Sequence, residues 1–340
     1  MIASVQYATE EQKAYLLMTT TNTDQIASVS VRFCGDSGDG MQMVGSQFTD
    51  SVALAGNDFS TAPDFPSEIR APKGTIFGVS GFQVQFASKD IHTPGDTVHA
   101  MVAMNPAGFK SNLGDVEHGG LIIVNEDEFD KKHLEKCGYE QGYNPLNDDE
   151  LASRYKICRV PMSRLTRETL SGDQDVSVKD IDRCRNMFAL GIVCWLYSRD
   201  LQPTIDRLQH YFGTVKKKQH IAQLNVSALK AGYYFGETAE LFPARYEVAP
   251  AELPAGMYRR ISGNEATVLG LTVAANKADR ELFYASYPIT PASEVLHGLA
   301  RLKHYGVRTF QAEDEIAAVM AANGASYAGD IAVSGTSGPG

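Results

Sequence analysis

Apolar and polar positions first fall into a regular pattern at residues 29–34, where the run Val-Ser-Val-Arg-Phe-Cys is typical of a strand. A glycine-rich turn follows, and the spacing of apolar residues over 41–55 predicts a helix. Further strands are expected at 75–86, 97–104, 120–124 and 155–160, with turns or helices between them. This order predicts an α/β domain.

Two helices are expected to close this domain. Residues 185–200 are apolar on nearly all sides, which predicts a buried helix, and residues 201–212 predict a second one. From residue 213 to 260 the pattern is irregular and includes Pro243, Pro250 and Pro254. We interpret that segment as a linker to the next domain.

Regular alternation returns near residue 263. Helices are predicted at 264–277, 291–305 and 315–328, and strands at 282–287, 307–312 and 331–334. Alternating strands and helices predict a parallel sheet, which binds ligands at the carboxyl ends of its strands. The sequence stops in a glycine-rich loop, Gly-Thr-Ser-Gly-Pro-Gly at 335–340, that would normally open the next helix, so we expect this second α/β domain to be truncated.

The predicted organisation is therefore an N-terminal extension (1–27), a first α/β domain (28–212), a linker (213–260) and a second domain (261–340). The chain has 340 residues, of which 43% are hydrophobic, and this is enough for two or three domains that each have a hydrophobic core. The longest apolar run, 187–197, is much shorter than the roughly 20 residues that span a bilayer, and no signal peptide is recognised. We expect a cytoplasmic protein that does not bind membranes. A net charge of −10 argues against nucleic acid.

Cysteines occur at positions 34, 137, 158, 184 and 194, and no two have the spacing that clusters or zinc sites use, so no metal site is predicted in this chain. Lysines at 216–218 form the main basic cluster, either a solvated helix end or a contact for the phosphates of a nucleotide-like ligand.

Two candidate sites lie in the first domain. The turn Gly-Asp-Ser-Gly-Asp-Gly at 35–40 could hold a phosphate at a helix N-terminus. Asp36 and Asp39 would repel that phosphate, so we prefer a structural turn in which a Ser or Asp caps the helix. In the loop 65–74, Arg70 and Lys73 could clamp an anion, or Arg70 could pair with Glu68 at the surface.

Two more candidates follow strands of the second domain. In Tyr-Pro-Ile-Thr-Pro at 287–291, Thr290 could cap the next helix with Pro291 as its first residue, while Pro288 stiffens the turn at the mouth of the sheet. In the acidic turn Glu-Asp-Glu at 313–315, carboxylates are favoured by the helix dipole. The following helix is rich in alanine, which would let another backbone or another subunit pack close and draw Glu315 into a buried interface.

Three segments taken together, Tyr-Pro-Ile-Thr-Pro-Ala-Ser-Glu at 287–294, Gln-Ala-Glu-Asp-Glu-Ile-Ala-Ala at 311–318 and the loop 335–340, resemble the α-subunits of 2-oxoacid:ferredoxin oxidoreductases. Their order and spacing match the pyrimidine-binding domain for thiamine diphosphate, and residues 29–212 are similar to the γ-type domain that many members carry fused in front. The spelling at 311–315 is most similar to the 2-oxoglutarate branch.

The resemblance implies that thiamine diphosphate lies between this chain and a partner β-subunit, which supplies Mg²⁺ and a four-iron four-sulfur cluster. Glu315 would contact N1′ of the aminopyrimidine, Thr290 would face the substrate, and Pro288 and Ile289 would line the cofactor. The implied reaction is coenzyme A-dependent oxidative decarboxylation of 2-oxoglutarate, with ferredoxin as electron acceptor or donor. The complex would be an αβ unit or a dimer of αβ units.

Other interpretations stay open at this point. Within the enzyme class, pyruvate or another 2-oxoacid is the alternative substrate. A nucleotide-binding oxidoreductase would use the turn at 35–40, but it needs a third glycine and an acidic residue at spacings that are not clear here. A non-catalytic assembly subunit would use the alanine-rich helix as an interface alone.

Overall fold

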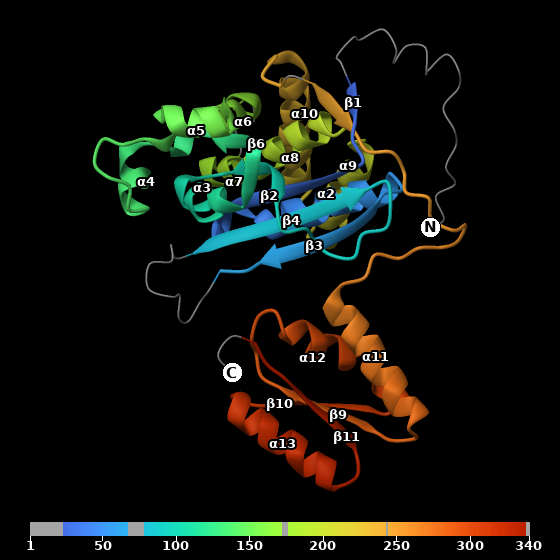
Figure 1. Cartoon of the computed structure of the whole chain (residues 1–340). Coiled ribbons are helices and arrows are strands. Elements are labelled where there is room, and N and C mark those ends of the chain that lie inside the picture. The colour runs from blue at the N-terminus through green and yellow to red at the C-terminus, as the bar shows by residue number, and fades with distance from the viewer. Residues whose placement is uncertain (1–22, 67–77, 172–175, 243, 338–340) are drawn as a thin grey trace. The chain divides into compact units, whose positions relative to one another are not determined.

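The computed structural model describes residues 23–66, 78–171, 176–242 and 244–337, in two compact units (Figure 1). The first unit is Met1–Pro254 and the second is Ala255–Gly340. Arg70 and Lys73, in the candidate anion loop, lie outside the described residues. Within the described residues, no helix is both long enough and apolar enough to cross a membrane.

The first unit is built on a six-stranded sheet with the order β3-β4-β2-β5-β6-β7. Its strands are β2 (Ser28–Asp36), β3 (Asp58–Asp64), β4 (Val79–Ala87), β5 (Val98–Ala103), β6 (Val116–Asn125) and β7 (Lys156–Val160). Strands β2, β5, β6 and β7 run parallel, whereas β4 is antiparallel to both β2 and β3. The predicted α/β class is confirmed, and β3 is a strand that the pattern did not predict.

Both faces of this sheet are buried, because successive side chains of a strand point to opposite faces. On β5, Ala100 and Val102 belong to one hydrophobic core, and Met101 and Ala103 belong to the other. Helices cover both faces (Figure 1). They are α2 (Met41–Leu54), α3 (Pro106–Asn112), α4 (Lys131–Lys136), α5 (Asp149–Arg154), α6 (Met162–Leu170), α7 (Val178–Arg183), α8 (Arg185–Leu196), α9 (Gln202–Leu208) and α10 (Gln219–Thr238).

The expectation of an irregular linker from residue 213 is wrong for its first part. A π-helix (Gln209–Val215) continues from α9, and then α10 packs against the buried helix α8. The buried face of α10 mixes small residues such as Ala228 and Gly232 with apolar ones such as Leu224 and Leu229. The three prolines that indicated a linker all follow the end of α10.

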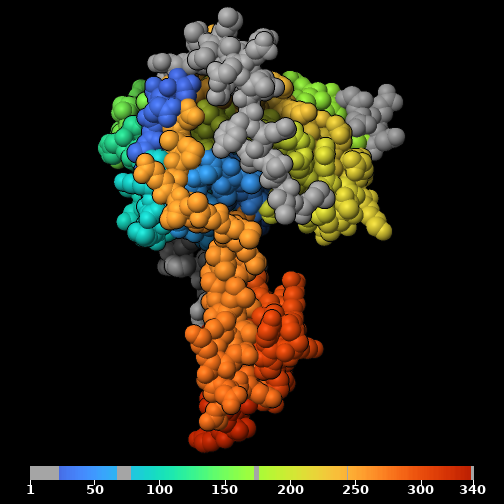
Figure 2. Space-filling model, turned by 90° about the vertical axis from the view of Figure 1, so that its right-hand side faces the viewer, coloured from blue at the N-terminus to red at the C-terminus, as the bar shows by residue number. Residues whose placement is uncertain are grey.

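The end of the first unit returns to its beginning. Strand β8 (Arg245–Glu247) pairs in parallel with β1 (Thr23–Gln25), and the Gln25 side-chain amide donates to the Glu247 carboxylate at 2.7 Å. Figure 2 shows the blue β1 segment beside the orange segment around β8 on the surface. The predicted extension and linker therefore each contribute a strand to this unit.

The second unit is a three-stranded parallel sheet with helices on both faces. Its elements are α11 (Gly263–Lys277), β9 (Leu282–Ser286), α12 (Ser293–Leu299), β10 (Val307–Gln311), α13 (Glu315–Tyr327) and β11 (Ile331–Gly335), with β9 in the centre. A capping box starts α11, in which Ser262 accepts from the Glu265 amide and Glu265 accepts from the Ser262 amide. The predicted parallel sheet is confirmed.

Thiol reactivity should separate one cysteine from the other four. All five are free, and burial raises the pKa of Cys34, Cys184 and Cys194 to about 12 and that of Cys158 to about 11. Cys137 is only partly buried, although burial and the Asp36 charge raise its pKa as well. Because the reagent needs access to the thiolate, we expect a disulfide reagent at pH 8 to modify Cys137 first and the others only on unfolding. A Cys137→Ser variant should lose the fast phase, and a fast phase that persists there would contradict the assignment.

Candidate functional site

Loops from all three strands of the second unit meet at one edge of the sheet. The strands are parallel, so their carboxyl ends lie together. The loop after β9 is tied to the loop after β11 twice: the Tyr287 hydroxyl shares a 2.7 Å hydrogen bond with that of Thr336, and the Ser337 hydroxyl donates to the Thr290 carbonyl at 2.9 Å. The candidate residues at 287–290 are thus held at the edge where ligands of such sheets bind.

Thr290 does not cap the next helix, so that prediction is wrong. Helix α12 begins at Ser293, whose hydroxyl accepts from the Ile289 amide at 2.9 Å and donates to the Ile289 carbonyl at 3.0 Å. Those two bonds close the turn without Thr290. Its side chain is exposed, and its hydroxyl forms no hydrogen bond with any described residue. The hydroxyl is therefore available to a ligand.

Two carboxylates of the acidic turn after β10, those of Asp314 and Glu315, differ in their contacts. Asp314 caps α13, since its side chain accepts from the Ala317 amide at 2.8 Å. Glu315 is the first residue of α13 and is exposed, without an ion pair or a hydrogen bond to its side chain among the described residues. The structure thus places Glu315 on the loop after β10 and Thr290 on the loop after β9, at the same edge of the sheet.

Helix α13 has two different faces. Ala318 and Ala322 are buried against the unit's own sheet, so the close packing that the alanine-rich sequence predicted occurs on this face against the backbone of the same unit. The opposite side carries Ile316, Val319 and Met320, which are 71%, 47% and 63% exposed. Exposed apolar clusters of this kind mark interaction surfaces.

In the first unit, the turn at 35–40 is structural, but the prediction that its Ser or an Asp caps the following helix is wrong, because the N-cap of α2 is Gly40 and no side chain caps it. The Asp39 carboxylate accepts from the Asp36 amide at 2.8 Å and from the Asn105 side chain at 2.9 Å, and it pairs with Arg185 at 2.5 Å. Burial and the neighbouring Asp39 charge raise the pKa of the Asp36 carboxyl. Two carboxylates lie in the turn, and Arg185 is already paired with Asp39. The structure therefore gives no support for phosphate binding at this turn.

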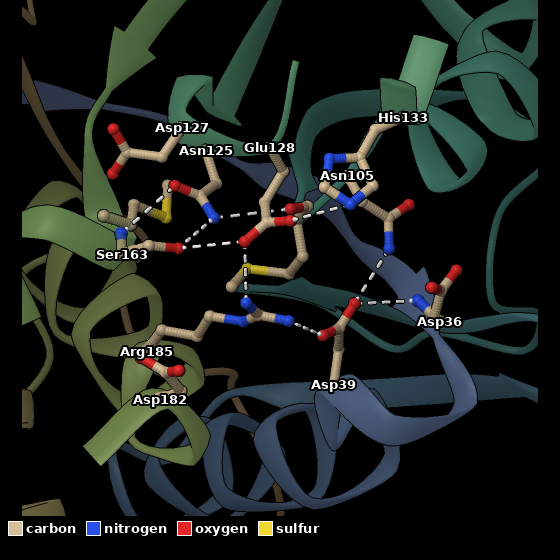
Figure 3. A network of polar contacts seen from close by, with 12 residues as sticks. Asp36, Asp39, Asn105, Asn125, Asp127, Glu128, His133, Ser163, Asp182 and Arg185 are labelled. Carbon is tan, nitrogen blue, oxygen red and sulfur yellow. Dashed lines mark hydrogen bonds and ion pairs between the residues drawn. The ribbon is translucent and has the colours of Figure 1, made fainter. Parts of the chain in front are cut away.

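Figure 3 shows that Asp39 belongs to a larger polar network. Arg185 lies between Asp39 and Glu128, at 2.8 Å from the latter, and the Ser163 hydroxyl, which donates to Glu128, accepts from Asn125 at 2.9 Å. Asp39, Glu128 and Ser163 follow the carboxyl ends of β2, β6 and β7, and Arg185 is the first residue of α8. The sequence pattern did not predict this network, although polar residues directly after apolar strands were a usable signal.

Removing the cation from this network should destabilise the first unit. In an Arg185→Met variant, Asp39 keeps two hydrogen bonds but loses its counter-charge, although its side chain is only 4% exposed. We expect a loss of about 2 to 3 kcal/mol in the free energy of unfolding, measured by urea denaturation. Arg167→Met is the matched control, because Arg167 pairs with Asp182 at the surface and should cost less than about 1 kcal/mol. Equal losses of unfolding free energy in the two variants would contradict a buried ion pair between Arg185 and Asp39.

Comparisons with known proteins agree with this arrangement. Residues 30–235 match the family described as pyruvate ferredoxin/flavodoxin oxidoreductase. Residues 274–340 match the thiamine diphosphate-binding family of pyruvate flavodoxin/ferredoxin oxidoreductases. The chain therefore belongs to the pyruvate ferredoxin/flavodoxin oxidoreductase family, and the predicted resemblance is confirmed.

Its relatives include 2-oxoacid oxidoreductase subunits. The 2-oxoglutarate oxidoreductase subunit KorA of Mycobacterium tuberculosis is 49% identical over 93% of this chain and 47% of its own length. The 2-oxoglutarate synthase subunit KorA of Archaeoglobus fulgidus is 49% identical over 24% of this chain and 22% of its own. A structure of 2-oxoglutarate:ferredoxin oxidoreductase from Magnetococcus marinus, with 2-oxoglutarate, coenzyme A and succinyl-CoA bound, superposes with a TM-score of 0.67 at 27% identity, covering 92% of this chain and 48% of that one. This chain spans about half the length of the Mycobacterium relative.

Proposed function

We propose that this chain is part of the α-subunit of a thiamine diphosphate-dependent 2-oxoglutarate:ferredoxin oxidoreductase. In this reaction 2-oxoglutarate loses carbon dioxide, coenzyme A takes the succinyl group, and two electrons pass to ferredoxin. The reverse reaction uses the same groups. The observation that supports the proposal is that Thr290 and Glu315 each follow one of two neighbouring parallel strands, within the residues that match the thiamine diphosphate-binding family.

The residues at this edge fit one half of a thiamine diphosphate site. Glu315 is an exposed carboxylate without a partner among the described residues, so it can share a proton with N1′ of an aminopyrimidine. The exposed Thr290 hydroxyl can donate to the carboxylate or carbonyl of a 2-oxoacid, and Pro288 and Ile289 would line the ring. When bound, the cofactor supplies the carbon nucleophile that decarboxylation of a 2-oxoacid requires.

A partner β-subunit would complete the site. It would supply the Mg²⁺ and diphosphate contacts and the four-iron four-sulfur cluster, and ferredoxin would exchange electrons with that cluster. The exposed apolar face of α13, formed by Ile316, Val319 and Met320, follows Glu315 directly and is suited to contact that partner. The complex would be an αβ unit or a dimer of αβ units in the cytoplasm.

The choice of 2-oxoglutarate rests on the KorA relatives and on the Magnetococcus marinus structure. Two shorter matches, at 40% and 41% identity over 24% of this chain, are ketoisovalerate oxidoreductase subunits. Pyruvate or another 2-oxoacid is therefore the alternative substrate.

The full-length α-subunit, coexpressed with its β-subunit, should reduce a viologen dye when both 2-oxoglutarate and coenzyme A are supplied. Omitting coenzyme A should stop the reduction. Turnover of pyruvate without turnover of 2-oxoglutarate would keep the reaction class and overturn the substrate. The enzyme proposal would be overturned if an assembled complex that contains thiamine diphosphate and the iron-sulfur cluster turned over no 2-oxoacid.

A further inference from the structure

A cavity of about 250 Å³ lies in the first unit, at the amino ends of its parallel strands. The polar network of Figure 3 lies at the opposite, carboxyl ends of these strands. Benzene fits a cavity of about 150 Å³, and sites for larger ligands measure about 300 to 1,000 Å³. The cavity is therefore of the right size for a molecule as small as one amino acid and too small for a nucleotide.

One wall of the cavity carries a tyrosine hydroxyl without a partner among the described residues. Tyr197 lines it and is 3% exposed, yet its hydroxyl forms no hydrogen bond with any described residue. Burial raises the pKa of Tyr197 above its usual range, so the hydroxyl stays protonated and keeps its hydrogen. The ring of Tyr246, also in the cavity wall, lies 6.0 Å from that of Tyr197. A ligand that accepts from the Tyr197 hydroxyl would therefore gain a hydrogen bond in a largely desolvated wall of the cavity.

Two opposite charges line the same cavity without pairing with each other. Glu117 and Lys156 both contribute to its wall, and no ion pair joins them. His99 accepts from the Ser30 amide through Nδ1 at 3.0 Å, so its neutral form carries the proton on Nε2, which lies 3.9 Å from the Glu117 carboxylate. That distance is too long for a hydrogen bond. Glu117 and Lys156 are thus both available to a ligand that carries two charges.

The remaining wall is apolar. Ile26, Val29 and Leu121 supply aliphatic side chains, which we call the aliphatic wall. Val29 is almost fully buried and Ile26 packs against the same core, so the wall is held by the fold. A ligand that fills this cavity therefore needs an apolar body as well as charged groups.

We propose that this cavity binds a small zwitterion with an apolar side chain, of the class of apolar α-amino acids. Its ammonium group pairs with Glu117, its carboxylate pairs with Lys156 and accepts from Tyr197, and its side chain lies against the aliphatic wall. The site is separate from the proposed thiamine diphosphate edge, which belongs to the second unit. The proposal goes beyond the proposed function and does not depend on it.

Titration calorimetry with the intact protein tests this directly, because it requires no turnover. L-Leucine should bind saturably at one site. 4-Methylvalerate lacks the ammonium group and isoamylamine lacks the carboxylate, so each should bind at least about tenfold more weakly. Tyr197→Phe should weaken leucine binding by about tenfold, because it removes the hydroxyl and keeps the ring. Tyr139→Phe is the matched control, since Tyr139 packs in the other core of this unit.

A second variant tests the binding site at an exposed residue, where a substitution should not affect folding. Glu117 has an exposed side chain, so Glu117→Gln should fold normally and still weaken leucine binding about tenfold. Lack of saturable binding at millimolar leucine would overturn the proposal. So would equal binding of leucine and isoamylamine, or leucine binding that neither Tyr197→Phe nor Glu117→Gln changes.

Discussion

Replacing Glu315 by Gln is expected to lower kcat for 2-oxoglutarate-dependent dye reduction by about two orders of magnitude or more. A carboxylate can share a proton with N1′ of the aminopyrimidine, whereas an amide of the same shape cannot take one up. The measurement is steady-state turnover by the full-length α-subunit with its β-subunit, together with gel filtration to show that the variant complex still assembles.

Glu313→Gln is the control for this prediction. Glu313 is an exposed acidic residue two positions earlier, in the same turn but before the start of α13. The same charge is removed from the same helix end, so its turnover should stay within about twofold of wild type. Wild-type turnover in Glu315→Gln would remove Glu315 from the mechanism and favour a subunit whose α13 serves assembly alone.

Gly232→Ala should cost the first unit about 3 kcal/mol or more in the free energy of unfolding. Helices α8 and α10 approach so closely that a Cβ at Gly232 would lie 1.9 Å from the Phe188 carbonyl oxygen, and one at Gly191 would lie 2.1 Å from that of Leu229. Backbone oxygens cannot rotate away, so the helices must move apart and open a packed core. Urea denaturation followed by circular dichroism measures the loss.

The matched control lies in another helix. Gly270 in α11 has no atom within 4 Å of the position that a Cβ would occupy, so Gly270→Ala should stabilise its helix by about 0.5 to 1 kcal/mol. A Gly232→Ala protein as stable as wild type would mean that α8 and α10 do not pack as described.

Elements with a strong local pattern could be predicted, and those that depend on tertiary packing could not. The run at 29–34 and the apolar helix α8 were predictable because their periodicity is unambiguous. Helix α10 was missed although its buried face includes Leu224, Val226 and Leu229, while the part played by its buried glycines, such as Gly232 against Phe188 of α8, is visible only when both helices are present. The short strand β8 has no pattern of its own and exists through its pairing with β1.

The candidate site also includes features that could be predicted from the sequence and features that could not. Glu315 and Thr290 were predicted from a resemblance, and the structure places both at one sheet edge, but their roles stay a prediction. The capping role given to Thr290 failed because Ser293 closes that turn instead. The network around Arg185 joins Asp39 to Glu128 across distant parts of the sequence, so local pattern could not have assembled it.

The pairing of β1 with β8 bears on how the protein is made. Gln25 is among the first described residues to leave the ribosome, and its partner Glu247 is synthesised 222 positions later. At about 5 to 20 residues per second, β1 waits for tens of seconds or less while the sheet between them forms. During that interval its amides and carbonyls form an open edge that another chain could occupy. Translation through residue 247 is therefore the step that ends the exposure of this edge in the nascent chain.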